Sequence, residues 1–121
     1  MSINQPRGCK YGLEGIKKYS YNLTKMIIDF HTHILPPRFK NHREEYLEMD
    51  ASFAELYSDP KSKIISAENL IDSMDINGID ISVVMGIGWS NIEIAMEAND
   101  YIIDSIQRYP TRLVGFFSVN P

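Results

Sequence analysis

Three short apolar segments alternate along the chain with two segments of helical periodicity. The apolar segments lie at about residues 26–33, 81–85 and 113–119, and glycine or proline follows each of them. A strand that is joined to the next strand through a helix is parallel to it in nearly all proteins, because the crossover packs back onto the sheet in one hand only. The alternation therefore predicts an α/β fold with three parallel strands whose carboxyl ends share one edge.

Capping residues delimit the two crossover helices. Ser66 is expected to cap the first helix and Gly78 to end it in a left-handed conformation. Ser90 and Glu93 form an S-x-x-E capping box for the second helix, and Pro110 follows its end. The predicted apolar side of the first helix consists of Ala67, Leu70, Ile71 and Met74. The predicted apolar side of the second consists of Ile92, Ala95, Met96, Asn99, Ile102, Ile103 and Ile106.

Residues 1–25 differ in charge and pattern from the rest of the chain. They carry five basic residues and one acid, a net charge of +4, whereas residues 26–121 carry seven basic and fifteen acidic residues. We interpret residues 1–25 as a flexible extension and residues 26–121 as the folded part. A targeting segment and an anion-binding tail are less favoured alternatives. The highly charged stretch from Arg38 to Met49 is expected to form a short surface helix.

Composition narrows the classes of protein to consider. The chain has 121 residues, one cysteine and a net charge of −4. These values predict a cytoplasmic protein without an intramolecular disulfide, and they argue against nucleic acid or a membrane as a partner. The length is well below the roughly 250 residues of a closed eight-stranded α/β barrel.

Two histidines end the first apolar segment, MIIDFHTHILPP. Because side chains alternate along a strand, Asp29, His31 and His33 are expected to point to one face. Pro36 and Pro37 cannot continue a strand, so the histidines lie at its carboxyl end, where parallel α/β folds bind ligands. Two neutral imidazoles at this spacing can bind one divalent metal ion, most favourably Zn²⁺. Histidines without a metal are the alternative that the spacing leaves open.

Three separated segments together resemble a known family. IIDFHTHILPPRF, AENLIDSMDINGIDISVVMG and ANDYIIDSIQRYPTRLVGFFSVNP are similar, in order and spacing, to the opening third of the amidohydrolase-related (amidohydrolase 2) family. This family of metal-dependent TIM barrels includes hydrolases and nonoxidative decarboxylases similar to aminocarboxymuconate semialdehyde decarboxylase. The resemblance implies that residues 26–121 form the N-terminal βαβαβ part of a TIM (β/α)8 barrel, which is incomplete in this chain.

The resemblance also implies roles for particular residues. It assigns His31 and His33 as metal ligands and Asp29 as a supporting catalytic carboxylate, with further ligands on later strands. Arg38 and Trp89 follow strand ends and are candidates for a substrate pocket, Arg38 by binding a substrate carboxylate. The implied substrates are small carboxylates, esters or amides. His42, the third histidine, is interpreted as a solvated surface residue.

Two other functions compete with the enzyme interpretation. The chain is alternatively a truncated, non-catalytic α/β fragment that self-associates as a homo-oligomer to cover its strand edges. It is also compatible with a small flavodoxin-like binding module. The glycines at Gly86 and Gly88 suggest a phosphate-binding loop, but the third glycine of that fingerprint and the P-loop lysine are both missing.

Overall fold

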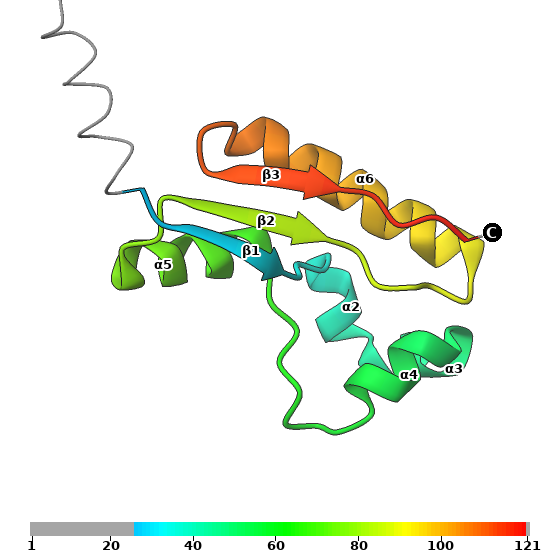
Figure 1. Ribbon diagram of the computed structural model, residues 1–121. Coiled ribbons are helices and arrows are strands. Elements are labelled where there is room, and N and C mark those ends of the chain that lie inside the picture. Colours follow the sequence, from blue (N-terminus) through cyan, green and yellow to red (C-terminus); the bar gives the residue numbers. More distant parts are fainter. Residues whose placement is uncertain (1–25, 121) are drawn as a thin grey trace, which may run out of the picture.

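The computed structural model describes residues 26–120 and contains the three predicted strands (Figure 1). The prediction of a flexible segment at residues 1–25 lies outside the described residues. The strands and helices are β1 (Ile28–Thr32), α2 (Pro37–Asn41), α3 (Arg43–Met49), α4 (Ala51–Tyr57), α5 (Ala67–Asn77), β2 (Ile81–Met85), α6 (Ile92–Arg108) and β3 (Leu113–Phe116).

The three strands form one parallel sheet in the order β1-β2-β3. This confirms an α/β fold with a small parallel sheet and two crossover helices. β3 ends at Phe116, three residues earlier than predicted, because the backbone that follows bonds to α6 instead of to a strand. The N–H of Ser118 donates to Asn99 Oδ1 (3.1 Å), and Asn99 Nδ2 donates to the Ser118 carbonyl (2.8 Å). Asn99 therefore bonds both backbone groups of Ser118.

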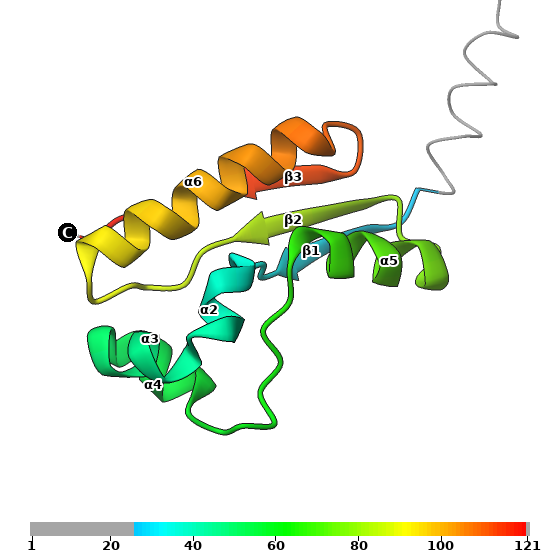
Figure 2. The same ribbon diagram turned by 180° about the vertical axis from the view of Figure 1, so that it is seen from behind.

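Helices α5 and α6 cover the same face of the sheet, as the view from behind shows (Figure 2). Apolar side chains from β2, β3 and both helices meet there in one buried cluster. Its members include Leu70, Met74, Val84, Ile102 and Leu113, each at most 6% exposed. A Cβ added at Gly115 would lie 2.7 Å from Cγ2 of Ile102, so glycine lets α6 approach β3 closely.

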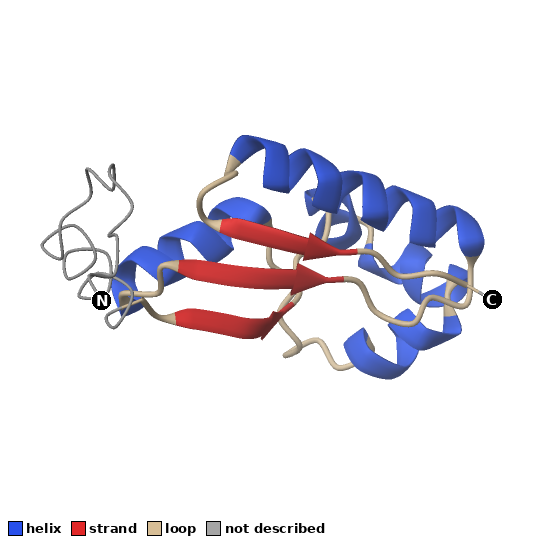
Figure 3. Cartoon of the chain, turned by 45° about the horizontal axis from the view of Figure 1, so that its top comes forward, coloured by secondary structure: helices blue, strands red, loops and turns tan. Residues whose placement is uncertain are grey.

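Among the helices of residues 26–120, none lies over the opposite face of the sheet (Figure 3). Val114 and Phe116 pair with Val83 and Met85 and lie on this face, where they are 47% and 60% exposed. Phe30 of β1 is 70% exposed. The sheet therefore presents a half-exposed apolar surface, which is unusual for a parallel sheet.

The termini of the two long helices are capped, one as predicted and one not. Ser66 caps α5 reciprocally with Asn69, and Gly78 ends the helix with φ 68°. At α6 the cap is Asn91, whose Oδ1 accepts from the N–H of Glu93 (2.9 Å) and of Ile94 (3.3 Å). The predicted Ser90–Glu93 capping box is wrong, because Ser90 Oγ accepts the N–H of Ala51 instead.

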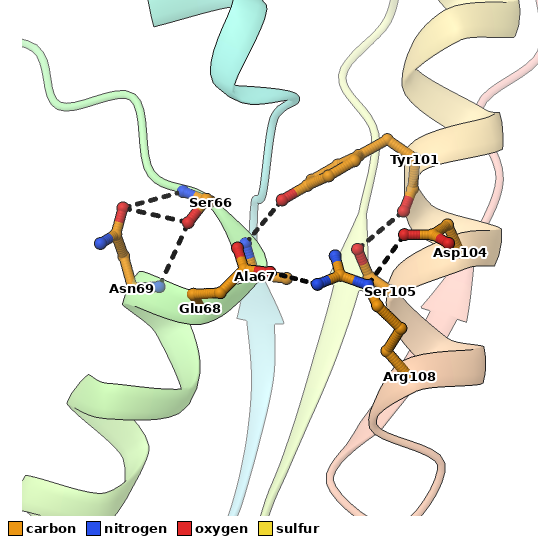
Figure 4. Close-up of polar contacts among 8 residues, drawn as sticks. All are labelled: Ser66, Ala67, Glu68, Asn69, Tyr101, Asp104, Ser105 and Arg108. Atoms are coloured by element: carbon orange, nitrogen blue, oxygen red, sulfur yellow. Dashed lines mark hydrogen bonds and ion pairs between the residues drawn. The ribbon is translucent and has the colours of Figure 1, made fainter.

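Polar contacts join the start of α5 to α6 (Figure 4). The Ala67 N–H donates to the Tyr101 hydroxyl at 2.9 Å, and Arg108 pairs with both Glu68 and Asp104. The hydrogen bond from Arg108 lowers the pKa of the Glu68 carboxyl. These contacts fix the two crossover helices relative to each other.

The buried face of α6 is rotated from the predicted one. Ile92, Met96 and Ile103 belong to the predicted apolar side but are 62%, 61% and 37% exposed. Two predicted members, Ala95 and Ile102, are buried, and with them Ile94, Ala98 and Ser105, which were not predicted. Ile94, Ala95 and Ala98 face a second core that the sequence pattern did not reveal.

This second core lies beyond the carboxyl ends of the strands, where α2, α3 and α4 gather (Figure 1). The predicted single surface helix over residues 38–49 is in fact α2 and α3. Both bury an aromatic side chain, Phe39 and Tyr46, whose rings stack with centroids 3.9 Å apart. Phe53 of α4 and Trp89 complete the aromatic cluster.

We call the segment that forms α2, α3 and α4 the insertion. Asp50 links this insertion to the loop before α6. Its side chain is fully buried, and Oδ1 accepts the N–H of Phe53 at 2.8 Å. Oδ2 accepts the N–H of Ser90 (2.9 Å) and the N–H of Asn91 (2.8 Å). One carboxylate thus caps α4 and holds the β2–α6 loop in place. Among the helices of residues 26–120, none is long and apolar enough to cross a bilayer.

Candidate metal centre

The two histidines lie at the carboxyl end of β1, as predicted. The strand ends at Thr32, and His33 follows it directly. Thr32 Oγ1 donates to the Val83 carbonyl at 2.8 Å and fixes this strand end against β2.

The imidazoles of His31 and His33 converge, with their Nε2 atoms 3.0 Å apart. Their ring centroids are 4.9 Å apart and the rings are nearly perpendicular, at 80°. His31 is exposed and His33 is half-buried, so solvent reaches the pair from one side. The arrangement brings two nitrogen donors to one point at the surface of the sheet edge.

A backbone contact sets the hydrogen position on His33. Its Nδ1 lies 2.9 Å from the carbonyl oxygen of Met85, the last residue of β2. A carbonyl only accepts hydrogen bonds, so Nδ1 carries the hydrogen and donates it. In the neutral ring the lone pair is then on Nε2, the atom that faces His31. Metal-binding histidines are commonly oriented by such a bond from the other ring nitrogen.

The donor set fits part of a divalent metal site. Two imidazole nitrogens that each lie about 2.0–2.1 Å from one zinc ion are at most about 4.2 Å apart. The observed separation of 3.0 Å is within this limit. Within residues 26–120, no group of three or more histidine, cysteine, aspartate or glutamate side chains is placed to hold a metal. The described part of the chain therefore offers at most two of the three protein ligands that a catalytic zinc usually has.

Asp29 does not share the simple alternation that we predicted. β1 and β2 pair Asp29 with Ser82 and Thr32 with Val84, so three residues of β1 span two of β2. This register shift breaks the period of two between Asp29 and the histidines. The Asp29 carboxylate accepts the backbone N–H of His31 at 3.1 Å. Its role as a supporting carboxylate stays a prediction.

The two candidate pocket residues differ in burial: Trp89 is buried and Arg38 is exposed. The Trp89 side chain is 4% exposed and packs in the aromatic core, its ring centroid 5.8 Å from that of Phe39. Arg38 is exposed, with its guanidinium carbon 6.0 Å from the Tyr46 ring centroid. Within residues 26–120, no hydrogen bond links either residue to the histidines. The burial places Trp89 in the core, and a substrate role for either residue stays a prediction.

His42 is an exposed residue between α2 and α3, as expected. Its Nδ1 lies 3.7 Å from a carboxylate oxygen of Glu45, and 57% of its side chain is exposed. Sequence reasoning missed the Met85 carbonyl, which orients His33. No sequence pattern identifies a backbone acceptor on a neighbouring strand, because that contact depends on strand register.

Comparisons with models of known protein families and with curated proteins find no match.

Proposed function

We propose that the chain is the N-terminal part of a metal-dependent hydrolase or nonoxidative decarboxylase of the amidohydrolase-related type and contributes the metal ligands of its first strand. In this proposal His31 and His33 bind one divalent ion, most favourably Zn²⁺. The observation that carries it is the convergence of the two Nε2 atoms at 3.0 Å, with the His33 ring oriented by the Met85 carbonyl. The family itself is proposed on the three sequence segments that resemble it.

A bound ion would supply Lewis-acid chemistry by polarising an oxygen of a small carboxylate, ester or amide substrate. The chain's own groups would hold the ion and orient the histidine rings that bind it. Thr32 fixes the end of β1, and the Met85 carbonyl keeps the His33 ring in the tautomer whose Nε2 can bind. Remaining ligands and a general acid or base would have to come from elsewhere in the assembled site. We therefore expect no metal-dependent turnover from these two histidines alone.

The experiment is a calorimetric titration of the metal-free 121-residue chain with Zn²⁺. We expect one ion per chain, and a loss of affinity of at least tenfold in His31→Ala and in His33→Ala. His42→Ala is the matched control, because it removes the third histidine of the chain from an exposed position outside the pair. Equal binding by all four proteins would contradict the proposal.

A self-associating α/β fragment is the second candidate. The exposed apolar side chains on the uncovered face of the sheet favour it, since Phe30, Val114 and Phe116 are all at least 47% exposed. In that case the histidine pair would have no catalytic role. Sedimentation of the chain at several concentrations distinguishes a monomer from an assembly.

A further inference from the structure

A cleft of about 420 Å³ lies between the α2–α3 segment and the chain that leads into α5. Lys40 and Arg43 line one side of this cleft, and Lys61 and Lys63 line the other. A smaller cavity of about 220 Å³ shares Lys40 and Asn69 with it and adds the buried side chain of Leu35. Neither His31 nor His33 lines either space, so this basic cleft is separate from the candidate metal centre.

The charge of the cleft opposes that of its surroundings. Residues 26–121 contain seven basic residues and fifteen acids, yet four of the seven line this cleft and no acidic side chain lines it. In residues 26–120, Arg108 and Arg112 form ion pairs with acids, whereas the four cleft residues form none. Such a concentration of basic side chains without ion pairs attracts an anion and focuses its approach.

Hydrogen bonds of Arg43 and Asn69 organise the cleft. Arg43 donates to the carbonyls of Asp59 (3.3 Å) and Ser62, and so holds the turn that carries Lys61 and Lys63. Asn69 accepts the N–H of Ser66 through Oδ1 at 3.1 Å, which leaves its Nδ2 as a donor. In Figure 4 this nitrogen points away from Ser66. No hydrogen bond from it to another described residue is present, so it adds a neutral donor at the cleft wall.

We infer that the basic cleft binds a small polyanion that carries phosphate or carboxylate groups. Its volume is in the range of small-molecule sites, and Arg43 with three lysines supplies donors that match several anionic oxygens at once. Phosphate and carboxylate groups share this recognition chemistry. The two anions used in the test below distinguish a phosphate ligand from a carboxylate ligand.

The test is a calorimetric titration of the full 121-residue chain with tripolyphosphate and, separately, with citrate. We expect saturable binding of at least one of them, weakened by added salt. The double variant Lys61→Gln, Lys63→Gln should weaken it about tenfold. Both lysines are exposed, so an unchanged circular dichroism melting curve should accompany the loss. Tighter binding of tripolyphosphate assigns a phosphate-bearing ligand, and tighter binding of citrate assigns a polycarboxylate.

The matched control is Lys17→Gln, Lys18→Gln, which removes the same charge from the basic N-terminal segment. It should bind as the unmodified chain does. If this control loses binding and the cleft variant keeps it, the assignment of the cleft is overturned. If neither tripolyphosphate nor citrate binds, the assignment of the cleft is overturned as well. This holds even if a long polyanion such as poly(U) binds. His31→Ala should leave anion binding unchanged, so this test and the metal test fail independently.

Discussion

Replacement of Asp50 by alanine should lower the free energy of unfolding more than the same replacement of any other aspartate or glutamate in residues 26–120. Its carboxylate accepts three backbone N–H groups, those of Phe53, Ser90 and Asn91, at 2.8–2.9 Å, and it is fully buried. Loss of the α4 cap costs about 1 kcal/mol. Each of the two loop N–H groups left without a partner costs about 1–3 kcal/mol. The free energy of unfolding should therefore fall by about 3–7 kcal/mol, a large part of the roughly 5–15 kcal/mol of a typical domain.

Urea unfolding followed by circular dichroism measures this loss. Asp72→Ala is the matched control, because Asp72 is an exposed acid on α5 without a hydrogen bond or ion pair to another described residue. It should change the free energy of unfolding by less than about 0.5 kcal/mol. Asp50→Asn keeps one carbonyl oxygen and should fall between the two. A loss below about 1 kcal/mol for Asp50→Ala would refute the view that this carboxylate joins the insertion to the β2–α6 loop.

Three further predictions concern pH, the N-terminal segment and the uncovered sheet face. Burial and a hydrogen bond to Glu97 raise the pKa of Tyr46 to about 12. As the pH rises, Tyr46 therefore loses its proton at a lower pH in the unfolded chain than in the folded chain. Stability should therefore decline by about 2–3 kcal/mol between pH 10 and 12, and less in Tyr46→Phe, as denaturation at each pH would measure. Deletion of residues 1–25 should change the melting temperature by less than about 2 °C in calorimetry, and a large drop would show that they belong to the core. Val114→Thr with Phe116→Thr should reduce self-association in sedimentation, whereas unchanged association would place the contact elsewhere.

Local patterns predicted the strands and the first helix well, because their signals are carried by neighbouring residues. Ser66 and Gly78 delimit α5 as expected, and the apolar run at residues 81–85 is β2. The second helix shows where this reasoning stops. An S-x-x-E pattern indicated a cap at Ser90, but tertiary contacts engage Ser90 with Ala51 and leave the cap to Asn91.

The aromatic core was not predictable from periodicity for a similar reason. Phe39 and Tyr46 lie within the highly charged stretch and Phe53 lies four residues beyond it, and three short helices are needed to bring them together. The same limit applies to the candidate site. The H-x-H spacing predicted two converging imidazoles, but the register shift at Asp29 and the Met85 carbonyl that orients His33 depend on how β1 and β2 pair.

Nitrogen NMR of the chain labelled with ¹⁵N-histidine tests the central claim most directly, because it reports each ring nitrogen separately during addition of Zn²⁺. We predict that the Nε2 signals of His31 and His33 both change and saturate at one ion per chain. The Nδ1 signal of His33 should stay that of a protonated nitrogen, and His42 should be unaffected. A change at only one of the two histidines, or metal binding through Nδ1 of His33, would contradict a shared site formed by the two Nε2 atoms.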